Sequence, residues 1–306
     1  MKNTNCIPAE RRFTIMQFNE RFPDDDACLD WLMEKRYPGG IATCSYCRVE
    51  RKHHRIASKK AYACDYCGTY ISPMAGTIFE KSSTSLRLWF YAMYLMSSTR
   101  CGVSAKQIQR ETGVTYKTAW RMFKQIRSML KDEVSGLGGP DSPGVEMDET
   151  YMGGVRKGVK GKPAAGDKKK TAVVGIVERQ GRIRALTARD TKSSTLLGMV
   201  KEHILPNTVV FTDEYAPYDG ISHMTNGYTH KRIKHSEKIY VVGDIHTNTV
   251  EGFWSLLKGG LRGVYHSVGK EYLQSYLDEY TFRYNRRNDP KPMFTSFLEQ
   301  VIAEAE

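Results

Sequence analysis

The spacing of apolar residues predicts two kinds of structure in different parts of the chain. From Ser83 to about residue 133, apolar side chains recur every three or four positions, which is typical of packed helices. Residues 134–144 are rich in glycine and proline and predict a linker. After this linker, strands alternate with helical stretches. Strands are expected at 145–151, 171–178, 182–189 and 209–213, and a helix at 193–203.

The helical region predicts three helices, and the last two suggest DNA contact. Ser104 caps a short helix at 105–112, Gly113 makes a turn, and a longer helix follows at 116–130. This arrangement resembles a helix-turn-helix, although any three-helix bundle would show the same pattern. The outer face of the longer helix carries the residues that we expect to contact DNA, namely Tyr116, Lys117, Arg121 and Lys124.

Two of the predicted strands carry an aspartate that needs a partner. Asp148 lies within the first of these strands, and Asp213 ends the last. A carboxylate at the end of a buried strand is costly unless a cation or hydrogen bonds hold it. A helix predicted at 248–261 adds Glu251 in its first turn and Lys258 two turns later, on roughly the same face. Three carboxylates from two strands and a helix are what a two-metal phosphoryl-transfer site requires.

Two other interpretations of these acidic residues stay open. Glu251 also fits a capping box that begins at Asn248, in which the glutamate bonds back to the backbone of the cap residue. Glu149 and Glu214 could be the functional acids in place of the aspartates. A register shift of one residue turns every side chain of a strand to the other face, and the alternation also places Glu146 on the face of Asp148.

Two cysteine pairs predict a structural zinc site. Two residues separate the cysteines of each pair and sixteen separate the pairs, which is the spacing of two knuckles that close on one tetrahedral ion. The expected ligands are Cys44, Cys47, Cys64 and Cys67. The alternative is that the two pairs are redox-active CxxC motifs. If zinc is bound, the four thiolates complete its coordination and leave no position for a histidine. The segment between the pairs predicts a side that faces nucleic acid, with His53, His54, Arg55, Lys59, Lys60 and Tyr62.

The charge of the chain predicts a polyanionic partner. The formal net charge is +12 over 306 residues, which favours nucleic acid. Residues 156–170 hold seven cations against one aspartate, so we expect an arm on the DNA backbone, with a solvated loop as the alternative. Further expected DNA contacts are Lys168, Lys169, Lys170, His246 and Arg262. Whether His230, His235 or His246 adds to the acidic site stays open.

Other classes of protein fit the sequence poorly. No stretch is long and apolar enough to span a bilayer, and the N-terminus lacks the apolar segment of a signal peptide. The seven cysteines are an odd number, which argues against a disulfide framework. We therefore expect a cytoplasmic, nucleoid-associated protein with no membrane partner.

The order of these motifs resembles a known family. The stretches are VEMDETYMGG, VFTDEYAPY, HTNTVEGFWSLLKGGLRGVYH and YLDEYTFRYNRR. They are similar to those of bacterial insertion-sequence DDE transposases that join an N-terminal zinc ribbon to a ribonuclease H-like catalytic core, the ISXO2-like transposase family. The resemblance covers about residues 20–290.

The resemblance implies a fold, cofactors and an activity. Asp148, Asp213 and Glu251 would hold two magnesium or manganese ions, and Lys258 would hold phosphate beside them. The implied activity is cleavage of DNA at terminal inverted repeats, followed by strand transfer into target DNA, by a homodimer or higher oligomer. The fold class is a multidomain α+β or α/β protein. Its expected parts are a helical lead-in (1–40), a zinc ribbon (41–82), a helix-turn-helix domain (83–133), the linker (134–144), a ribonuclease H-like core (145–290) and a C-terminal helix (291–306).

Two rival functions remain. A zinc-ribbon and helix-turn-helix DNA-binding regulator with an inactive ribonuclease H-like domain would explain the charge and the first 130 or so residues, but it needs no aligned acidic triad. A structure-specific nuclease would use the same core, but it would not usually carry two recognition modules.

Overall fold

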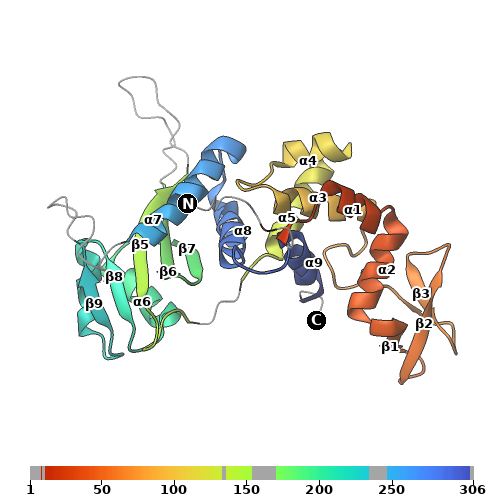
Figure 1. Cartoon of the computed structure of the whole chain (residues 1–306), viewed down its shortest axis with the longest axis horizontal. Helices are drawn as coiled ribbons and strands as arrows, with labels where there is room; N and C mark the ends of the chain where they lie inside the picture. The colour runs from red at the N-terminus through yellow and green to blue at the C-terminus, as the bar shows by residue number, and fades with distance from the viewer. Residues whose placement is uncertain (1–7, 9–10, 133–135, 154–169, 234–246, 304–306) are drawn as a thin grey trace. The chain divides into compact units, whose positions relative to one another are not determined.

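The computed structural model describes residue 8 and residues 11–132, 136–153, 170–233 and 247–303. The chain forms two compact units, Met1–Met129 with Asp289–Glu306, and Leu130–Asn288 (Figure 1). No helix among the described residues is long and apolar enough to cross a membrane. Some predicted features lie outside the described residues, namely most of the basic arm with Lys168 and Lys169, His235 and His246.

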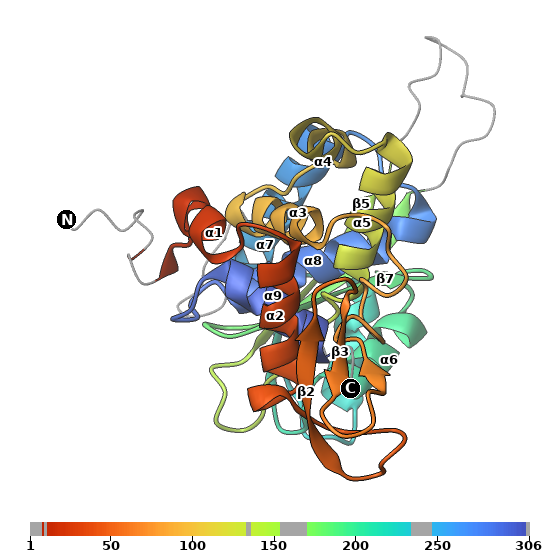
Figure 2. The same ribbon diagram turned by 90° about the vertical axis from the view of Figure 1, so that its right-hand side faces the viewer.

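The first unit contains a small antiparallel sheet in the order β1-β2-β3-β4. Its strands are β1 (Ile41–Thr43), β2 (Glu50–Ile56), β3 (Ala61–Cys64) and β4 (Tyr70–Ile71). Helix α2 (Asp25–Arg36) lies beside this sheet in both views, after the short helix α1 (Ile15–Arg21) and before the 3-10 turn η2 (Pro38–Gly40) (Figure 2). Asp24 caps α2 by accepting the Ala27 N–H at 2.8 Å.

Three further helices follow the sheet: α3 (Leu86–Ser98), α4 (Ala105–Thr112) and α5 (Tyr116–Ser128). Ser104 and Thr115 cap α4 and α5 by accepting backbone N–H groups, which confirms the two predicted starts. Gly113 ends α4 with φ at 71°, a left-handed conformation that glycine adopts without the steric cost of a side chain. The local sequence therefore determines the turn between these helices.

A helix from the far end of the chain completes the core of the first unit. Helix α9 (Met293–Ala303) packs against α3 and α2. The ring of Phe294 lies 4.9 Å from that of Phe13, 5.9 Å from Phe18 and 5.8 Å from Tyr94, measured between centroids. These separations are those of interacting aromatic pairs, so residues more than 190 positions apart share one apolar cluster.

The second unit is built on a five-stranded sheet in the order β7-β6-β5-β8-β9. Its strands are β5 (Val145–Met152), β6 (Thr171–Glu178), β7 (Ile183–Ala188), β8 (Val209–Thr212) and β9 (Thr229–Arg232). The first three are antiparallel, whereas β8 runs parallel to β5 and β9 parallel to β8. The four predicted strands are present. The apolar pattern did not predict β9, because this edge strand, THKR, is polar.

Helices cover both faces of this sheet. On one face, α6 (Ser193–His203) and η3 (Ala216–His223) share a buried cluster with Val145 and Met147 of β5. On the other face, α7 (Asn248–Gly260) and α8 (Leu273–Asn285) share a second cluster with Val173 and Val177 of β6. A π-helical turn (Leu261–Tyr265) and a 3-10 turn (Lys270–Tyr272) connect α7 to α8. Alternate residues of β5 therefore face different helices.

The glycine-rich stretch before β5 is packed against the second unit from residue 136 onward. Leu137 is buried; its N–H donates to the His203 carbonyl at 2.8 Å and its carbonyl accepts the Leu205 N–H at 2.9 Å. The N–H of Gly139 donates to the Thr208 hydroxyl at 2.7 Å. Composition predicts a linker here, but these hydrogen bonds attach residues 136–139 to the end of α6 and the start of β8.

Candidate metal centres and nucleic-acid interface

Four cysteines of the first unit form a compact cluster. Among the described residues, Cys44, Cys47, Cys64 and Cys67 are the one group of three or more metal-binding side chains whose ligand atoms all lie within 4.8 Å of one another. The Sγ atoms of Cys44 and Cys67 are 3.4 Å apart, and those of Cys47 and Cys64 are 4.0 Å apart. A tetrahedron with zinc–sulfur bonds of about 2.3 Å has sulfur atoms roughly 3.8 Å apart, so these residues fit zinc.

The same local hydrogen bonds shape both cysteine turns. In the first, the Cys44 N–H donates to the Val49 carbonyl at 3.0 Å, and the Arg48 N–H returns to the Cys44 carbonyl at 2.8 Å. In the second, Cys64 and Gly68 make the equivalent bonds at 2.9 Å and 3.0 Å. Each turn thus presents its two thiols on one side. This geometry supports the expected structural zinc site, and the cluster consists of the four thiols alone, without His53 or His54.

The basic residues between the cysteine pairs do not all face outward as expected. Arg55 pairs with Asp26 of α2 at 2.5 Å, and Lys60 pairs with Asp25 at 3.2 Å. The hydroxyl of Tyr62 donates to Asp30 of the same helix, and His53 is 4% exposed. These contacts attach the sheet to α2, because its acidic side chains complement the cations. His54, Lys59 and Lys60 are exposed, although Lys60 is paired with Asp25.

In the second unit, strand pairing relates Asp148 to Asp213. Val145 pairs with Val210 and Glu146 with Phe211 in the parallel register of β5 and β8. Continued by two residues, this register sets Asp148 opposite Asp213, just past the end of β8. Residues opposite each other in neighbouring strands project from the same face, at a strand spacing of about 4.8 Å. Asp213 is close enough to Asp148 for its charge to raise the pKa of that carboxyl group.

Trp254 of α7 contacts Asp148 directly. Its indole Nε1–H donates to Asp148 Oδ2 at 2.8 Å. Burial raises the pKa of Asp148 to about 6; the carboxylates of Asp213 and Glu251 contribute to the rise, and the indole hydrogen bond opposes it. A carboxyl group whose charge is disfavoured by burial and by two acidic neighbours is one that a cation would stabilise.

The tryptophan has room because a glycine lies beneath it. Gly175 of β6 pairs with Asp148 across the sheet. A Cβ atom on Gly175 would lie 2.6 Å from the Trp254 ring and 3.1 Å from Val250. The absence of a side chain at this position lets α7 approach the strand that carries Asp148. The sequence gives no signal for this contact, which depends on tertiary packing.

Glu149 and Glu214 have different environments from the aspartates. Glu149 accepts the Tyr218 hydroxyl at 2.6 Å, on the face covered by η3. Burial raises the pKa of Glu149 to about 7, the Tyr218 hydrogen bond opposes the rise, and the charges of Asp148 and Asp213 add to it. Glu214 is exposed. The alternation of β5 thus directs Glu149 away from α7 and Asp148 toward it.

Helix α7 does not form the capping box that begins at Asn248. The helix starts at Asn248 with Thr247 as its N-cap, and Thr247 makes no side-chain cap bond. The hydroxyl of Thr247 donates to Glu251 at 3.2 Å. Glu251, Trp254 and Lys258 follow at intervals of three and four residues, so they lie along one stripe of the helix. Trp254, which donates to Asp148, lies in the middle of this stripe.

The cap of α7 comes instead from Glu146, whose role the sequence did not reveal. Glu146 Oε2 accepts the N–H groups of Thr249 at 2.9 Å and Val250 at 3.1 Å. Its Oε1 accepts the Thr249 hydroxyl at 2.9 Å and Arg179 Nε at 3.0 Å. This carboxylate is 0% exposed. The alternation of β5 correctly placed Glu146 on the face of Asp148 but gave no partner for it.

Three of the residues expected to bind phosphate line one pocket beside this stripe. Lys170, Lys258 and Arg262 come from the start of β6, from α7 and from the π-helical turn, and His266 and Tyr151 lie with them. A cluster of cations is suited to a phosphate backbone. The structure thus brings together three predicted residues that are far apart in the sequence.

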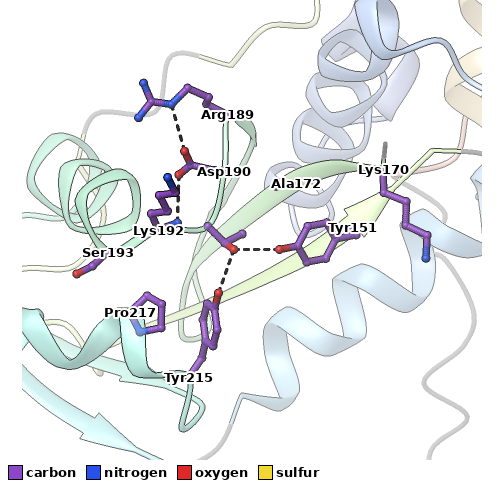
Figure 3. Close-up of a pocket in the computed structure, with 10 residues that line it drawn as sticks. Tyr151, Lys170, Ala172, Arg189, Asp190, Lys192, Ser193, Tyr215 and Pro217 are labelled. Carbon is purple, nitrogen blue, oxygen red and sulfur yellow. Dashed lines mark hydrogen bonds and ion pairs between the residues drawn. The ribbon is translucent and has the colours of Figure 1, made fainter. Parts of the chain in front are cut away.

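A second pocket is lined by Tyr151 and Tyr215. Each of these tyrosines follows an Asp-Glu pair in the sequence, Asp148-Glu149 or Asp213-Glu214. The hydroxyls of Tyr151 and Tyr215 both lie within hydrogen-bond distance of the Thr191 hydroxyl, at 2.9 Å and 3.1 Å. Figure 3 shows the two tyrosines at this pocket. Lys170 and Lys192 line the same pocket. Both rings remain partly exposed, at 51% for Tyr151 and 37% for Tyr215. Aromatic and cationic side chains of this kind suit a nucleotide strand.

The remaining predicted contacts are placed as follows. Tyr116, Lys117, Arg121 and Lys124 are all exposed on α5. Arg121 also donates to the hydroxyls of Ser82 and Thr84, each at 3.2 Å. His230 lies on β9 with Nε2 2.9 Å from the Thr212 hydroxyl, and burial lowers its pKa. His230 therefore contacts the strand that leads to Asp213.

Comparison with known proteins identifies transposase family models and similar proteins. The model described as the ISXO2-like transposase domain matches residues 136–285, and the transposase zinc-ribbon domain matches residues 23–70. An uncharacterized protein in transposable element ISH50 of Halobacterium salinarum is 26% identical over 86% of this chain and 91% of its own length. An uncharacterized transposase-like protein of Haemophilus influenzae is 26% identical over 40% of this chain and 94% of its own. The crystal structure of a pre-cleavage Mos1 transpososome aligns with 66% of this chain over 74% of its own chain, at 11% sequence identity and a TM-score of 0.25.

Proposed function

Since the chain belongs to the ISXO2-like transposase family, we propose that it cleaves DNA at the terminal inverted repeats of an insertion sequence and transfers the freed ends into target DNA. The observation that carries this proposal is the acidic site. Asp148 accepts a hydrogen bond from Trp254 of the helix that bears Glu251, and burial together with the charges of Asp213 and Glu251 raises the pKa of Asp148 to about 6.

The donor set of this site fits a hard divalent cation. Carboxylate oxygens suit magnesium and manganese, which prefer oxygen ligands. Asp148, Asp213 and Glu251 would hold the ions, and the ions would supply activation of a water molecule and stabilisation of the leaving 3′ oxygen. The three carboxylates come from β5, from the end of β8 and from the first turn of α7, and the sheet and α7 fix where they project.

The cations beside the acids would position the DNA strand. Lys258 lies two turns from Glu251 on the same stripe of α7 and would hold a phosphate next to the reacting one. Lys170 and Arg262 would bind adjacent phosphates. The rings of Tyr151 and Tyr215 would contact sugars or bases at the neighbouring pocket (Figure 3). His246 is a further proposed contact, although it lies outside the described residues.

Recognition of the repeats would fall to the first unit. A short helix, a left-handed glycine and a longer helix with exposed Tyr116, Lys117, Arg121 and Lys124 support a helix-turn-helix. The sheet order of the second unit, with three antiparallel strands followed by two parallel ones, supports a ribonuclease H-like core. Because cleavage at two ends needs both held together, we also propose a dimer or higher oligomer on DNA.

Single substitutions in the acidic site test the proposal. Asp148→Asn, Asp213→Asn and Glu251→Gln should each reduce cleavage of a duplex carrying the element's end to background, while binding of that duplex is retained. Glu214→Gln is the matched control, because this exposed acid adjoins Asp213 in the sequence. The readouts are product formation on a denaturing gel and a gel-shift titration.

The same experiment discriminates the rivals. A DNA-binding regulator would show no cleavage by the wild type under any divalent metal. Normal cleavage by Glu251→Gln, together with a lower melting temperature, would give Glu251 a structural role in α7 instead. A structure-specific nuclease would cut branched DNA in preference to linear ends.

A further inference from the structure

Helix α7 has an unusual start. The first N–H groups of any helix have no partner within the helix and need another acceptor. The N-cap of α7 makes no side-chain cap bond. The acceptor is Glu146 of the central strand β5. It accepts the N–H groups of Thr249 and Val250, which lie 103 and 104 positions later in the sequence. A negative charge at a helix N-terminus is also favoured by the helix dipole.

The Glu146 carboxylate is held from several sides. It is 0% exposed, and besides the two N–H groups it accepts the Thr249 hydroxyl and Arg179 Nε. The Arg179 side chain is 10% exposed, and its guanidinium lies 3.6 Å from the ring centroid of Phe211 on β8. A buried charge of this kind persists when it is paired and its remaining acceptor positions are filled. Glu146 therefore joins β5 to the end of β6 and to the start of α7.

This junction lies next to the proposed metal ligands on both elements. Along β5, Asp148 follows Glu146 by two residues and projects to the same face. Along α7, Glu251 follows Val250 directly, and Val250 donates its N–H to Glu146. One turn later, Trp254 donates to Asp148. The helix turn that carries Glu251 is thus fixed to β5 at both of its ends.

We infer that Glu146 is a positioning residue, which fixes the first turn of α7 so that Glu251 can complete the metal site with Asp148 and Asp213. This inference rests on the proposed function, since it takes Glu251 as a ligand. Glutamine could not replace Glu146, because its amide NH₂ would face N–H donors where a carboxylate presents acceptors. Partners that orient metal ligands typically change metal affinity by about 10-fold to 100-fold when they are altered.

The test measures metal dependence, which a purely stabilising residue would not change. Full-length wild type and Glu146→Gln are compared in cleavage of a duplex carrying the element's end, with Mn²⁺ titrated. We expect the half-saturating Mn²⁺ concentration of Glu146→Gln to rise by about tenfold, with the rate recovering at high Mn²⁺. Melting temperatures are recorded in parallel.

A matched control separates positioning from stability. Glu279 of α8 is another carboxylate with 0% exposure; it pairs with Arg283 at 2.6 Å within the same unit. Glu279→Gln should lower the melting temperature as Glu146→Gln does, and its Mn²⁺ curve should match that of the wild type. Identical Mn²⁺ curves for Glu146→Gln and Glu279→Gln would overturn the inference.

A milder variant decides the question if Glu146→Gln does not fold. Thr249→Val removes the hydroxyl donor to Glu146 and keeps the backbone bonds. A rise of about threefold in half-saturating Mn²⁺, the size of one hydrogen bond, would support positioning, and an unchanged curve would overturn it. Asp148→Asn is included as well. If it still cleaves, the proposed function fails; if it is inactive and the Glu146 and Thr249 variants behave as wild type, the positioning role alone fails.

Discussion

The two candidate metal sites of this chain are built in different ways. The four thiols come from two turns of one small sheet, and their sulfur atoms all lie within 4.8 Å of one another. The three carboxylates come from two strands and a helix spread over residues 148–251, and among the described residues they do not form a cluster of comparable tightness. One site is assembled by local turns and the other by the packing of a whole domain.

Because of this difference, the two sites suit different roles of a bound metal. Ligands that converge within a short segment suit an ion that holds the segment together, and four thiolates leave no open position. Carboxylates held apart on a rigid sheet suit ions that must also bind water and phosphate. The four predictions below test this contrast, in order of decreasing effect.

The largest effect is expected at the thiol site. Cys44→Ser or Cys67→Ser should release zinc and unfold the small sheet, because structural zinc contributes about 10–16 kcal/mol in modules of this kind. The second unit should keep its fold. Metal analysis and proteolysis check this, with Cys101→Ser as the control because Cys101 is exposed and outside the cluster. A protein with no zinc and an intact sheet would refute the zinc assignment.

The carboxylate site should respond to the loss of a ligand in the opposite way. Without metal, replacing Asp148 should stabilise the protein. The pKa of Asp148 is raised to about 6 from 3.8. The folded state therefore binds more protons than the unfolded state between these values, so stability falls as pH rises through this window and the cost persists at higher pH. Asp148→Asn should be more stable than wild type by about 1–3 kcal/mol at pH near 8 without added magnesium.

Two further measurements sharpen this prediction. Magnesium should raise the melting temperature of wild type and leave that of Asp148→Asn unchanged. For cleavage, the half-saturating magnesium concentration should rise as pH falls below about 6, since protons compete at Asp148. The opposite result would be a wild type at least as stable as Asp148→Asn at high pH without magnesium. It would contradict the interpretation that the buried charge of Asp148 destabilises the metal-free protein.

A packing change should show how far the acidic site depends on α7. Gly175→Ala places a methyl group 2.6 Å from the Trp254 ring, so the helix must shift. We expect a loss of about 1–2 kcal/mol in the free energy of unfolding and slower cleavage. Gly198→Ala on α6 is the control: nothing lies within 4 Å of its added Cβ, and alanine favours a helix. Equal effects of the two variants would mean that the Trp254 contact is unimportant.

The smallest effect concerns the cations beside the acids. Replacing Lys170 and Arg262 by alanine should flatten the slope of log affinity against log salt by about 0.9 for each phosphate that is no longer neutralised. The reduction in affinity should be equal for specific and unrelated duplexes, because cations that bind phosphate do not read sequence. Lys201→Ala is the control, since this exposed lysine lies on α6. An unchanged slope in the double variant would place the backbone-binding cations elsewhere.

The parts of the structure that were predictable from the sequence are those set by near neighbours. The cysteine spacing, the caps at Ser104 and Thr115, the alternation of β5 and the apolar runs of β6 and β8 are local signals, and each predicted the correct element. The caps form because side-chain oxygens and backbone N–H groups lie within three residues.

The features that sequence could not give depend on contacts between distant segments. Glu146 looked like one of several acids in β5, and its role as cap of α7 requires a helix more than 100 residues later. The basic face of the ribbon was overestimated because the partners of Arg55 and Lys60 lie in α2. The polar strand β9 has no apolar alternation to reveal it.

The position of α9 has a consequence for how the protein is made. Translation proceeds from the N-terminus, so the ribosome completes the residues of the first unit up to Met129 long before it adds Phe294. Until then, Phe13, Phe18 and Tyr94 lack a ring that packs against them in the final structure. The nascent first unit therefore keeps part of its aromatic core uncovered until the whole second unit has been synthesised. Completion of the first unit's core is thus a late step that follows synthesis of the second unit.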